Sequence, residues 1–419
     1  MSSSIIPGAS VPAPSVLSQR LARAGYALLV ALPLAMWLAN RSSPLVLGLA
    51  ALCFLCSALA DRGVADLLRR LRDVLRTPVG LALGAFMVWS LVTILWSHRQ
   101  ATSLAMWGEL AIPLASGLAI AASGRFRPGR LESRALAVAI AAAAIFMIAE
   151  LATGLSLRIA LDIGRQVTYI FNRPVLTCLV LLPVAAAGLF LGRGRTVFDW
   201  LLCAVMVLVV ASISFDSESG AAGLGFLLLA LAWIAARLLP RLTLAAVALG
   251  FVATMALAPV LGRLGDEALP ASLHERLANS HSRDRVDIWL SFGEAIRARP
   301  LLGSGFGTSP TLDRHPVALE VSPPRRQLLA VGHPHSAPVQ AWVETGVVGA
   351  ILLTLAGLAF LWRLRHLAAR DLAPRLALAA SAFGVATVAH GAWQGWWVAA
   401  LALAAVWLTC GLPSEGSDG

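Results

Sequence analysis

The sequence predicts an all-α integral membrane protein with about twelve transmembrane helices and one large helical loop. Three observations predict this class. The chain is 58% hydrophobic, only 13% charged and has a mean hydropathy of +0.78, whereas roughly a quarter of the residues of soluble domains are charged. Long apolar stretches recur along the chain, and one polar connection of about eighty residues, 262–340, separates the ninth from the tenth.

The apolar stretches define the candidate spans, because a helix needs about 20 apolar residues to cross about 30 Å of hydrocarbon. We expect spans at 24–40, 44–60, 79–96, 103–123, 135–155, 174–192, 197–214, 219–238, 241–261, 341–363, 376–392 and 394–412. The resulting domains are a disordered cytoplasmic N-terminus at 1–23, helices one to nine at 24–261, the loop at 262–340, helices ten to twelve at 341–412 and a cytoplasmic tail at 413–419.

The arginines predict the orientation of these spans. All 33 Lys and Arg positions are Arg. With the N-terminus in the cytoplasm, nineteen arginines lie in the short inner loops and five in the short outer loops, while nine lie in the 262–340 loop, whose length exempts it from the orientation rule. This asymmetry predicts that both termini are cytoplasmic and that the long loop is outside. The net charge of +11 therefore reflects topology, and we expect membrane lipids as partners and no nucleic acid.

The long loop contains a predicted amphipathic helix at 284–299. Ile288, Trp289, Phe292 and Ile296 recur there at helical spacing, with charged residues on the other side. A run of alternating glycines, 303–307, follows Pro300. It lacks the Lys-Ser/Thr and the strand context of a phosphate-binding loop, so the pattern favours a tight turn.

The most informative polar residues lie where the long loop enters the tenth span. His333, His335, Gln340 and Glu344 converge at that boundary, and histidine is the side chain best suited to move protons near neutral pH. A neutral His335 could accept a proton from a hydroxyl; alternatively, it caps the helix or hydrogen-bonds within the loop. A His-x-His pair can bind metal, but no matching Cys or carboxylate cluster accompanies it, so we expect no metal and no cofactor.

Three arginines near the predicted outer boundary are candidate anion ligands. Arg173 precedes Pro174 at the start of a span, and Arg283 and Arg285 open the amphipathic helix, where a positive charge opposes the helix dipole. A guanidinium group matches phosphate oxygens in two-pronged fashion. The alternatives are that Arg173 extends to lipid headgroups and that Asp284 and Asp287 neutralise the helix arginines locally.

Several of these segments together resemble the O-antigen ligase and polymerase superfamily, which are bacterial inner-membrane glycosyltransferases with about twelve spans and one large periplasmic loop. Two departures are Ser336, where the family usually has Asn, and Pro338. The segments that carry the resemblance are Arg285-Val286-Asp287-Ile288-Trp289, Arg299-Pro300-Leu301-Leu302-Gly303-Ser304-Gly305-Phe306-Gly307, and His333-Pro334-His335-Ser336 with Gln340, Glu344, Gly346 and Gly349, besides Asn172-Arg173-Pro174.

The resemblance implies a metal-independent, inverting transfer of a glycan from undecaprenyl diphosphate to a sugar hydroxyl of the lipid A core. The site would face the periplasm on the bacterial inner membrane. His335 would be the catalytic residue, and Arg173 and Arg285 would bind the donor diphosphate. The residues expected to support them are His333, Ser336, Gln340, Glu344 and Arg283.

Two other functions are consistent with this pattern. A polymerase of the same superfamily would use a second carrier-linked glycan as the acceptor. A polysaccharide or lipid transporter would carry out no chemistry, and would be favoured by broken helices with charges at mid-membrane. The gathering of polar residues at one predicted face favours an enzyme.

Overall fold

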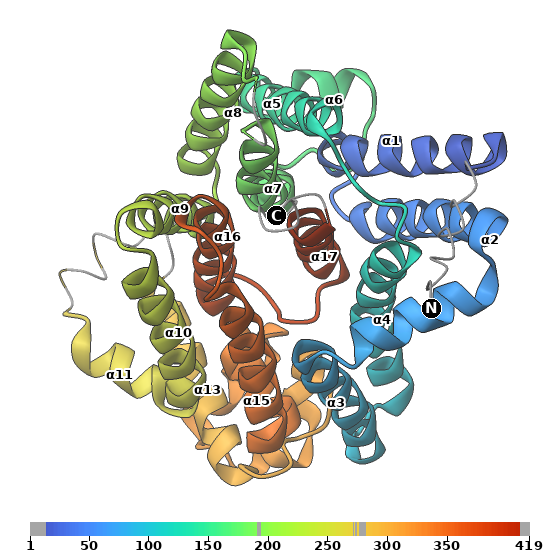
Figure 1. Cartoon of the computed structure of the whole chain (residues 1–419). Helices are drawn as coiled ribbons and strands as arrows, with labels where there is room; N and C mark the ends of the chain where they lie inside the picture. Colours follow the sequence, from blue (N-terminus) through green and yellow to red (C-terminus); the bar gives the residue numbers. More distant parts are fainter. Residues whose placement is uncertain (1–13, 191–193, 271, 273–274, 276–281, 411–419) are drawn as a thin grey trace, which may run out of the picture.

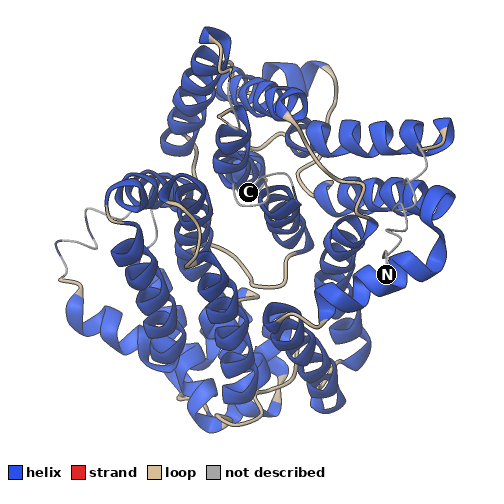
Figure 2. Ribbon diagram, viewed as in Figure 1, coloured by secondary structure: helices blue, strands red, loops and turns tan. Residues whose placement is uncertain are grey.

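A computed structural model describes residues 14–190, 194–270, 272, 275 and 282–410 of the chain. These residues form helices joined by turns, with no strand among them (Figure 2). The predicted all-α class is therefore confirmed.

Among the described residues, eleven helices are long and apolar enough to cross a membrane, counting short 3₁₀ or α-helical continuations with the helix that they extend. A twelfth apolar helix, α17, is shorter, with 16 residues; it corresponds to the last predicted span. The twelve helices are α1 (Val16–Leu38), α2 (Ser43–Leu75), α3 (Pro78–Thr93), α4 (Gln100–Ser123), α5 (Arg130–Ala152), α7 (Asn172–Leu189), α8 (Val197–Asp216), α9 (Gly220–Leu238), α10 (Pro240–Leu257), α15 (Ala337–Leu364), α16 (Ala369–Val388) and α17 (Gly395–Cys410).

Several helix boundaries differ from the expected spans; α2, for example, ends at Leu75 and not near 60. Two of the differences have a clear cause. Helix α1 starts at Val16, inside the 1–23 segment expected to be disordered, because Ser15 caps it and the Ser18 hydroxyl donates to the carbonyl of Ser57 on α2. Residues 1–13 and the 413–419 tail lie outside the described residues. Helix α15 starts at Ala337, before residue 341, since Pro338 at its first turn has the φ that a helix start requires.

Helix α7 is enclosed by other helices in the upper half of the view in Figure 1. Its side chains from Pro174 to Ala186 are all buried, and it packs against α5, α8, α16 and α17. Elsewhere α9 packs on α16, α1 on α2, and α3 on α15. The N-terminus of α7 carries Arg173, so burial of this helix fixes the position of that residue in the bundle.

The connection between α10 and α15 forms a helical cap at one end of the bundle, beside α10 and α15 (Figure 1). On α13, Ile288, Phe292 and Ile296 are buried against Leu329 and Val339, so the predicted amphipathic helix packs through its apolar side. The described elements of the cap are η3 (Ala258–Val260), α11 (Leu261–Ala268), α13 (Ser282–Ala298), η5 (Ser309–Arg314), η6 (Pro316–Glu320), α14 (Pro323–Arg326) and η7 (Gln327–Val331).

Candidate active site

The glycine-rich segment is a turn that packs against a break in α15. Gly346 has φ +64° inside α15, and a Cβ there would lie 2.2 Å from the Leu301 carbonyl oxygen. The turn donates from Ser304 N to the carbonyl of Val343 at 2.8 Å and from Gly305 N to that of Glu344 at 2.9 Å. Its amides thus bond to the carbonyls released by the break, which agrees with a tight turn.

Glu344 joins the first turns of α15 to two other segments. Its side chain is fully buried. One carboxylate oxygen accepts from Gly307 N and the Trp393 indole, both at 2.7 Å. The other accepts from Ser309 N at 3.2 Å and the Gln340 amide at 2.9 Å. Four donors therefore satisfy a carboxylate that would otherwise be costly to bury.

Gln340 extends this network toward the turn between α16 and α17. Its side-chain oxygen accepts from Ala392 N at 2.8 Å, and its own backbone N–H donates to Ser336 at 2.9 Å. The Ser336 hydroxyl is buried, with no partner among the described residues. Gln340 and Glu344 therefore join α15 to the turn between α16 and α17, and Ser336 is buried at the start of α15.

His335 has an unusual backbone conformation. Its φ of +50° lies in the left-handed region, which a non-glycine residue adopts at a cost and which often marks a functional site. Two contacts hold the turn: the Trp289 indole donates to the Pro334 carbonyl at 2.9 Å, and His335 N donates to His333 Nδ1 at 3.2 Å. The two imidazole rings lie 4.2 Å apart.

The hydrogen bond of His335 determines which ring nitrogen can take up a proton. Nδ1 lies 2.9 Å from the carbonyl oxygen of Ala389. A carbonyl only accepts, so Nδ1 carries the proton and Nε2 presents a lone pair in the neutral ring. Burial lowers the pKa of His335, as does the nearby Arg285, while the bond to Ala389 raises it. The net lowering favours the neutral ring, which is the form that can act as a base.

The arginines do not all contribute to this cluster. Arg285 is half-buried and close enough to His335 to disfavour its protonation. Arg283 is about 200° away around the helix, exposed, and paired with Asp266 at 2.8 Å and Asp287 at 3.3 Å. Arg283 is therefore occupied by local counter-charges, whereas Arg285 faces the histidines.

Arg173 reaches the cluster from α7. Its guanidinium lies over the Trp396 ring, 5.8 Å from the centroid. Burial, as the largest cause, together with the nearby His335, His390 and Arg173 lowers the pKa of His333 to about 3. Electrostatic interactions therefore link Arg173, Arg285, His333 and His335, which come from three separate segments.

His390 also belongs to this cluster and was missed by the sequence analysis. It is 8% exposed, in the turn between α16 and α17, and its ring lies 5.1 Å from that of Trp396. The span pattern contained a signal for it, because the tenth span begins and the eleventh ends on the same predicted face. His390, near the end of the predicted span 376–392, is therefore expected on the same face as His335.

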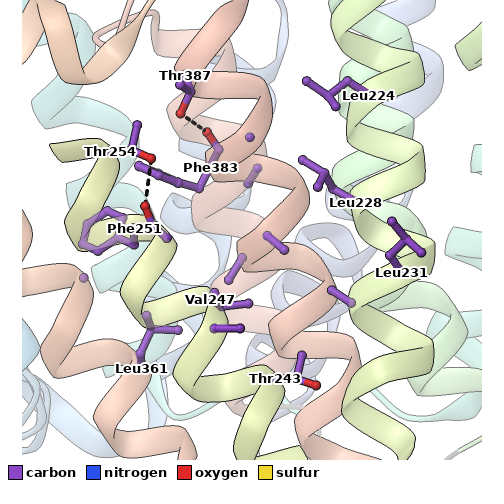
Figure 3. A pocket seen from close by; sticks show the side chains of 18 of the residues that line it. Leu224, Leu228, Leu231, Thr243, Val247, Phe251, Thr254, Leu361, Phe383 and Thr387 are labelled. Carbon is purple, nitrogen blue, oxygen red and sulfur yellow. Dashed lines mark hydrogen bonds between the residues drawn. The ribbon is translucent and has the colours of Figure 1, made fainter. Parts of the chain in front are cut away.

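An apolar groove of about 760 Å³ runs between α9, α10, α15 and α16 (Figure 3). Leu228, Phe251 and Phe383 line it, and the hydroxyl of Thr387 donates to the carbonyl four residues earlier in its own helix. The groove also includes Val388, next to the Ala389 that holds His335. It thus offers hydrocarbon-like lining that ends beside the polar cluster.

The described residues contain no group of three or more His, Cys, Asp or Glu side chains placed to hold a metal ion. The charged groups at the cluster are instead arginines, which stabilise anions without a metal. What the arrangement can do chemically is accept a proton at His335 Nε2 and bind negative charge between Arg173 and Arg285.

Comparisons with known proteins agree with the resemblance found in the sequence. Residues 201–354 match the family model described as O-antigen ligase. A protein of Rickettsia felis named "Putative polysaccharide ligase" is 24% identical over 343 residues, which cover 80% of this chain and 81% of the relative. Two similarly named proteins match as well, from Rickettsia conorii at 25% identity over 75% of both chains and from Rickettsia prowazekii at 24% over 49% of both. These similarities support the assignment of the chain to the O-antigen ligase family.

Proposed function

We propose that this protein is a lipid-linked glycan ligase. It transfers a glycan from undecaprenyl diphosphate to a sugar hydroxyl of the lipid A core, at the periplasmic face of the bacterial inner membrane, with both termini in the cytoplasm. The observation that carries the proposal is the hydrogen bond from His335 Nδ1 to Ala389, because it leaves Nε2 free to accept a proton beside two anion-binding arginines.

The proposed step is a single displacement. The acceptor oxygen attacks the anomeric carbon of the donor sugar, and the bond from that carbon to the phosphate oxygen breaks with its electron pair on the diphosphate. His335 Nε2 takes the hydroxyl proton. Arg173 and Arg285 bind the charge that grows on the leaving group, so the reaction needs cations more than a strong acid. Attack from the face opposite the leaving group inverts the anomeric configuration.

The two arginines of the predicted amphipathic helix provide a matched test of the diphosphate site. We expect Arg285→Gln to lower kcat/KM for the carrier-linked donor by about 10- to 100-fold, because it removes a charge-assisted contact with the phosphate. Arg283→Gln, which removes only exposed ion pairs, should stay within about twofold of wild type. Equal kinetics for the two variants at limiting donor would rule out this role for Arg285.

The groove provides a test of lipid recognition. Gly250 lines it, and a Cβ there meets nothing within 4 Å, so Gly250→Leu adds a side chain that starts in open space and narrows the groove. We expect it to raise KM for the undecaprenyl-linked donor by about 5- to 20-fold, with little change for a donor on a short prenyl chain. Gly84→Leu on α3, which also has open space, is the control. An unchanged KM for the long-chain donor in Gly250→Leu would exclude the groove as the carrier's binding site.

One assay distinguishes the three candidate functions. Purified protein is incubated with a carrier-linked glycan and either lipid A core or a second carrier-linked glycan. We expect extension of the lipid A core. Extension of the carrier-linked glycan alone would identify a polymerase, and the absence of any covalent product together with movement of the glycan across vesicles would identify a transporter.

A further inference from the structure

His390 has a buried nitrogen that nothing in the described structure explains. Its Nδ1 lies 3.2 Å from the carbonyl oxygen of Gly391, so Nδ1 carries the proton and Nε2 presents a lone pair. This Nε2 is buried and has no hydrogen-bond partner among the described residues. An unpaired buried polar atom is costly, and such atoms commonly indicate a functional role.

The surroundings of His390 disfavour a positive charge on its ring. Burial is the largest cause that lowers the pKa of His390, and Arg173 of α7 and His335 act in the same direction, while the bond to Gly391 raises it; the resulting pKa is about 4. His333, from the same turn as His335, also interacts with it electrostatically. The tryptophans packed against the ring from α17 carry no charge. Arg173 itself interacts electrostatically with Arg41 and with Glu109 of α4.

The turn that carries His390 is fixed on both sides. Ala389 accepts from His335, and Ala392 N donates to Gln340. A Cβ on Gly391 would lie 3.5 Å from the His333 ring. Trp396 contacts both the His390 ring and the Arg173 guanidinium. His390 is therefore held next to the proposed diphosphate site and cannot move away when an anion arrives there.

We propose that His390 is a ligand of the donor diphosphate that becomes charged only when the diphosphate binds. This inference rests on the proposed function. The anion offsets the repulsion by Arg173, so the imidazole takes one proton from solvent at Nε2 and donates it in a hydrogen bond to a phosphate oxygen. In the free site, neutral His390 adds no uncompensated charge. In the occupied site, protonated His390 is a cation beside the leaving group, on which negative charge accumulates.

The test is calorimetry of undecaprenyl diphosphate binding to the full-length protein, in buffers with different ionisation enthalpies. At neutral pH we expect the wild type to take up about one proton more than His390→Gln. The neutral amide of Gln can still donate to phosphate, so this variant should bind with a weaker pH dependence than wild type. Between the pKa of free His390, about 4, and its higher value in the complex, wild-type affinity should fall about tenfold for each unit of pH, beyond the dependence shared with the variant.

His390→Asn separates binding from folding. Asn can keep the bond to Gly391 but does not reach as far as Nε2, so we expect an unchanged melting temperature without ligand and about 10- to 100-fold weaker diphosphate binding. If both variants took up as many protons and bound the diphosphate as tightly as the wild type, the role of His390 would be wrong and the proposed function would stand. Failure of the wild-type protein to bind the diphosphate would overturn both.

Discussion

Replacing His335 by Ala should lower glycan transfer by about 10²- to 10⁴-fold, the range that a positioned general base contributes. The protein should still insert and bind the donor with near wild-type affinity, because the arginines remain. The measurement is kcat for purified protein with saturating donor and acceptor, together with donor binding. Transfer within threefold of wild type would contradict the assignment of His335 as the base.

A second variant of His335 is needed, because Ala can disturb the backbone at this position. Its φ of +50° is strained for Ala, whereas Asn is enriched in this region. His335→Asn should therefore keep the turn and still lose activity, because an amide cannot take the proton. Restored transfer in His335→Asn would mean that the residue shapes the turn without acting as a base. His333→Ala is a useful comparison, since His333 only accepts from His335 N and its loss should reduce activity less.

Replacing Glu344 by Ala should have the largest effect on folding. Four buried donors, from Gly307, Ser309, Gln340 and Trp393, would lose their acceptor. Each unpaired donor costs about 1–3 kcal/mol, and the total is comparable to the net stability of a typical domain. We expect little monodisperse protein after detergent extraction and a lower melting temperature for what remains.

Thr345→Val is the matched control for Glu344→Ala. The neighbouring Thr345 hydroxyl donates only to the Ala341 carbonyl of its own helix, at 2.6 Å, so its loss should change stability by about 1 kcal/mol or less. If the two variants had equal melting temperatures, the Glu344 network would not stabilise the fold as described.

Much of the fold was predictable from the sequence because spans depend on local properties. The apolar length of a span and its flanking arginines can be identified within each segment alone. The expected starts of α2 to α4 therefore lie close to the observed ones. Residues 16–23 were assigned wrongly, because α1 is stabilised there by contact between Ser18 and Ser57, and a sequence does not indicate such long-range pairing.

The candidate site was predictable only in part. The His333–Glu344 segment is contiguous, so its density of polar residues was visible. By contrast, charge and spacing did not separate Arg283 from Arg285. Only the resemblance assigned the diphosphate to Arg285, and the ion pairs of Arg283 depend on the folded structure. His390 depends on a turn folding back against α15 from more than fifty residues away, so the span pattern placed it on the face of His335 but did not pair the two residues.

The anomeric configuration of the product, determined by NMR for purified wild-type protein in the presence of a chelator, tests the central proposal most directly. If arginines and no metal bind the diphosphate, transfer should be undiminished by the chelator. If the acceptor displaces the diphosphate directly with the help of His335, the anomeric carbon should be inverted. Retention of configuration, or loss of transfer on chelation that added metal restores, would contradict it.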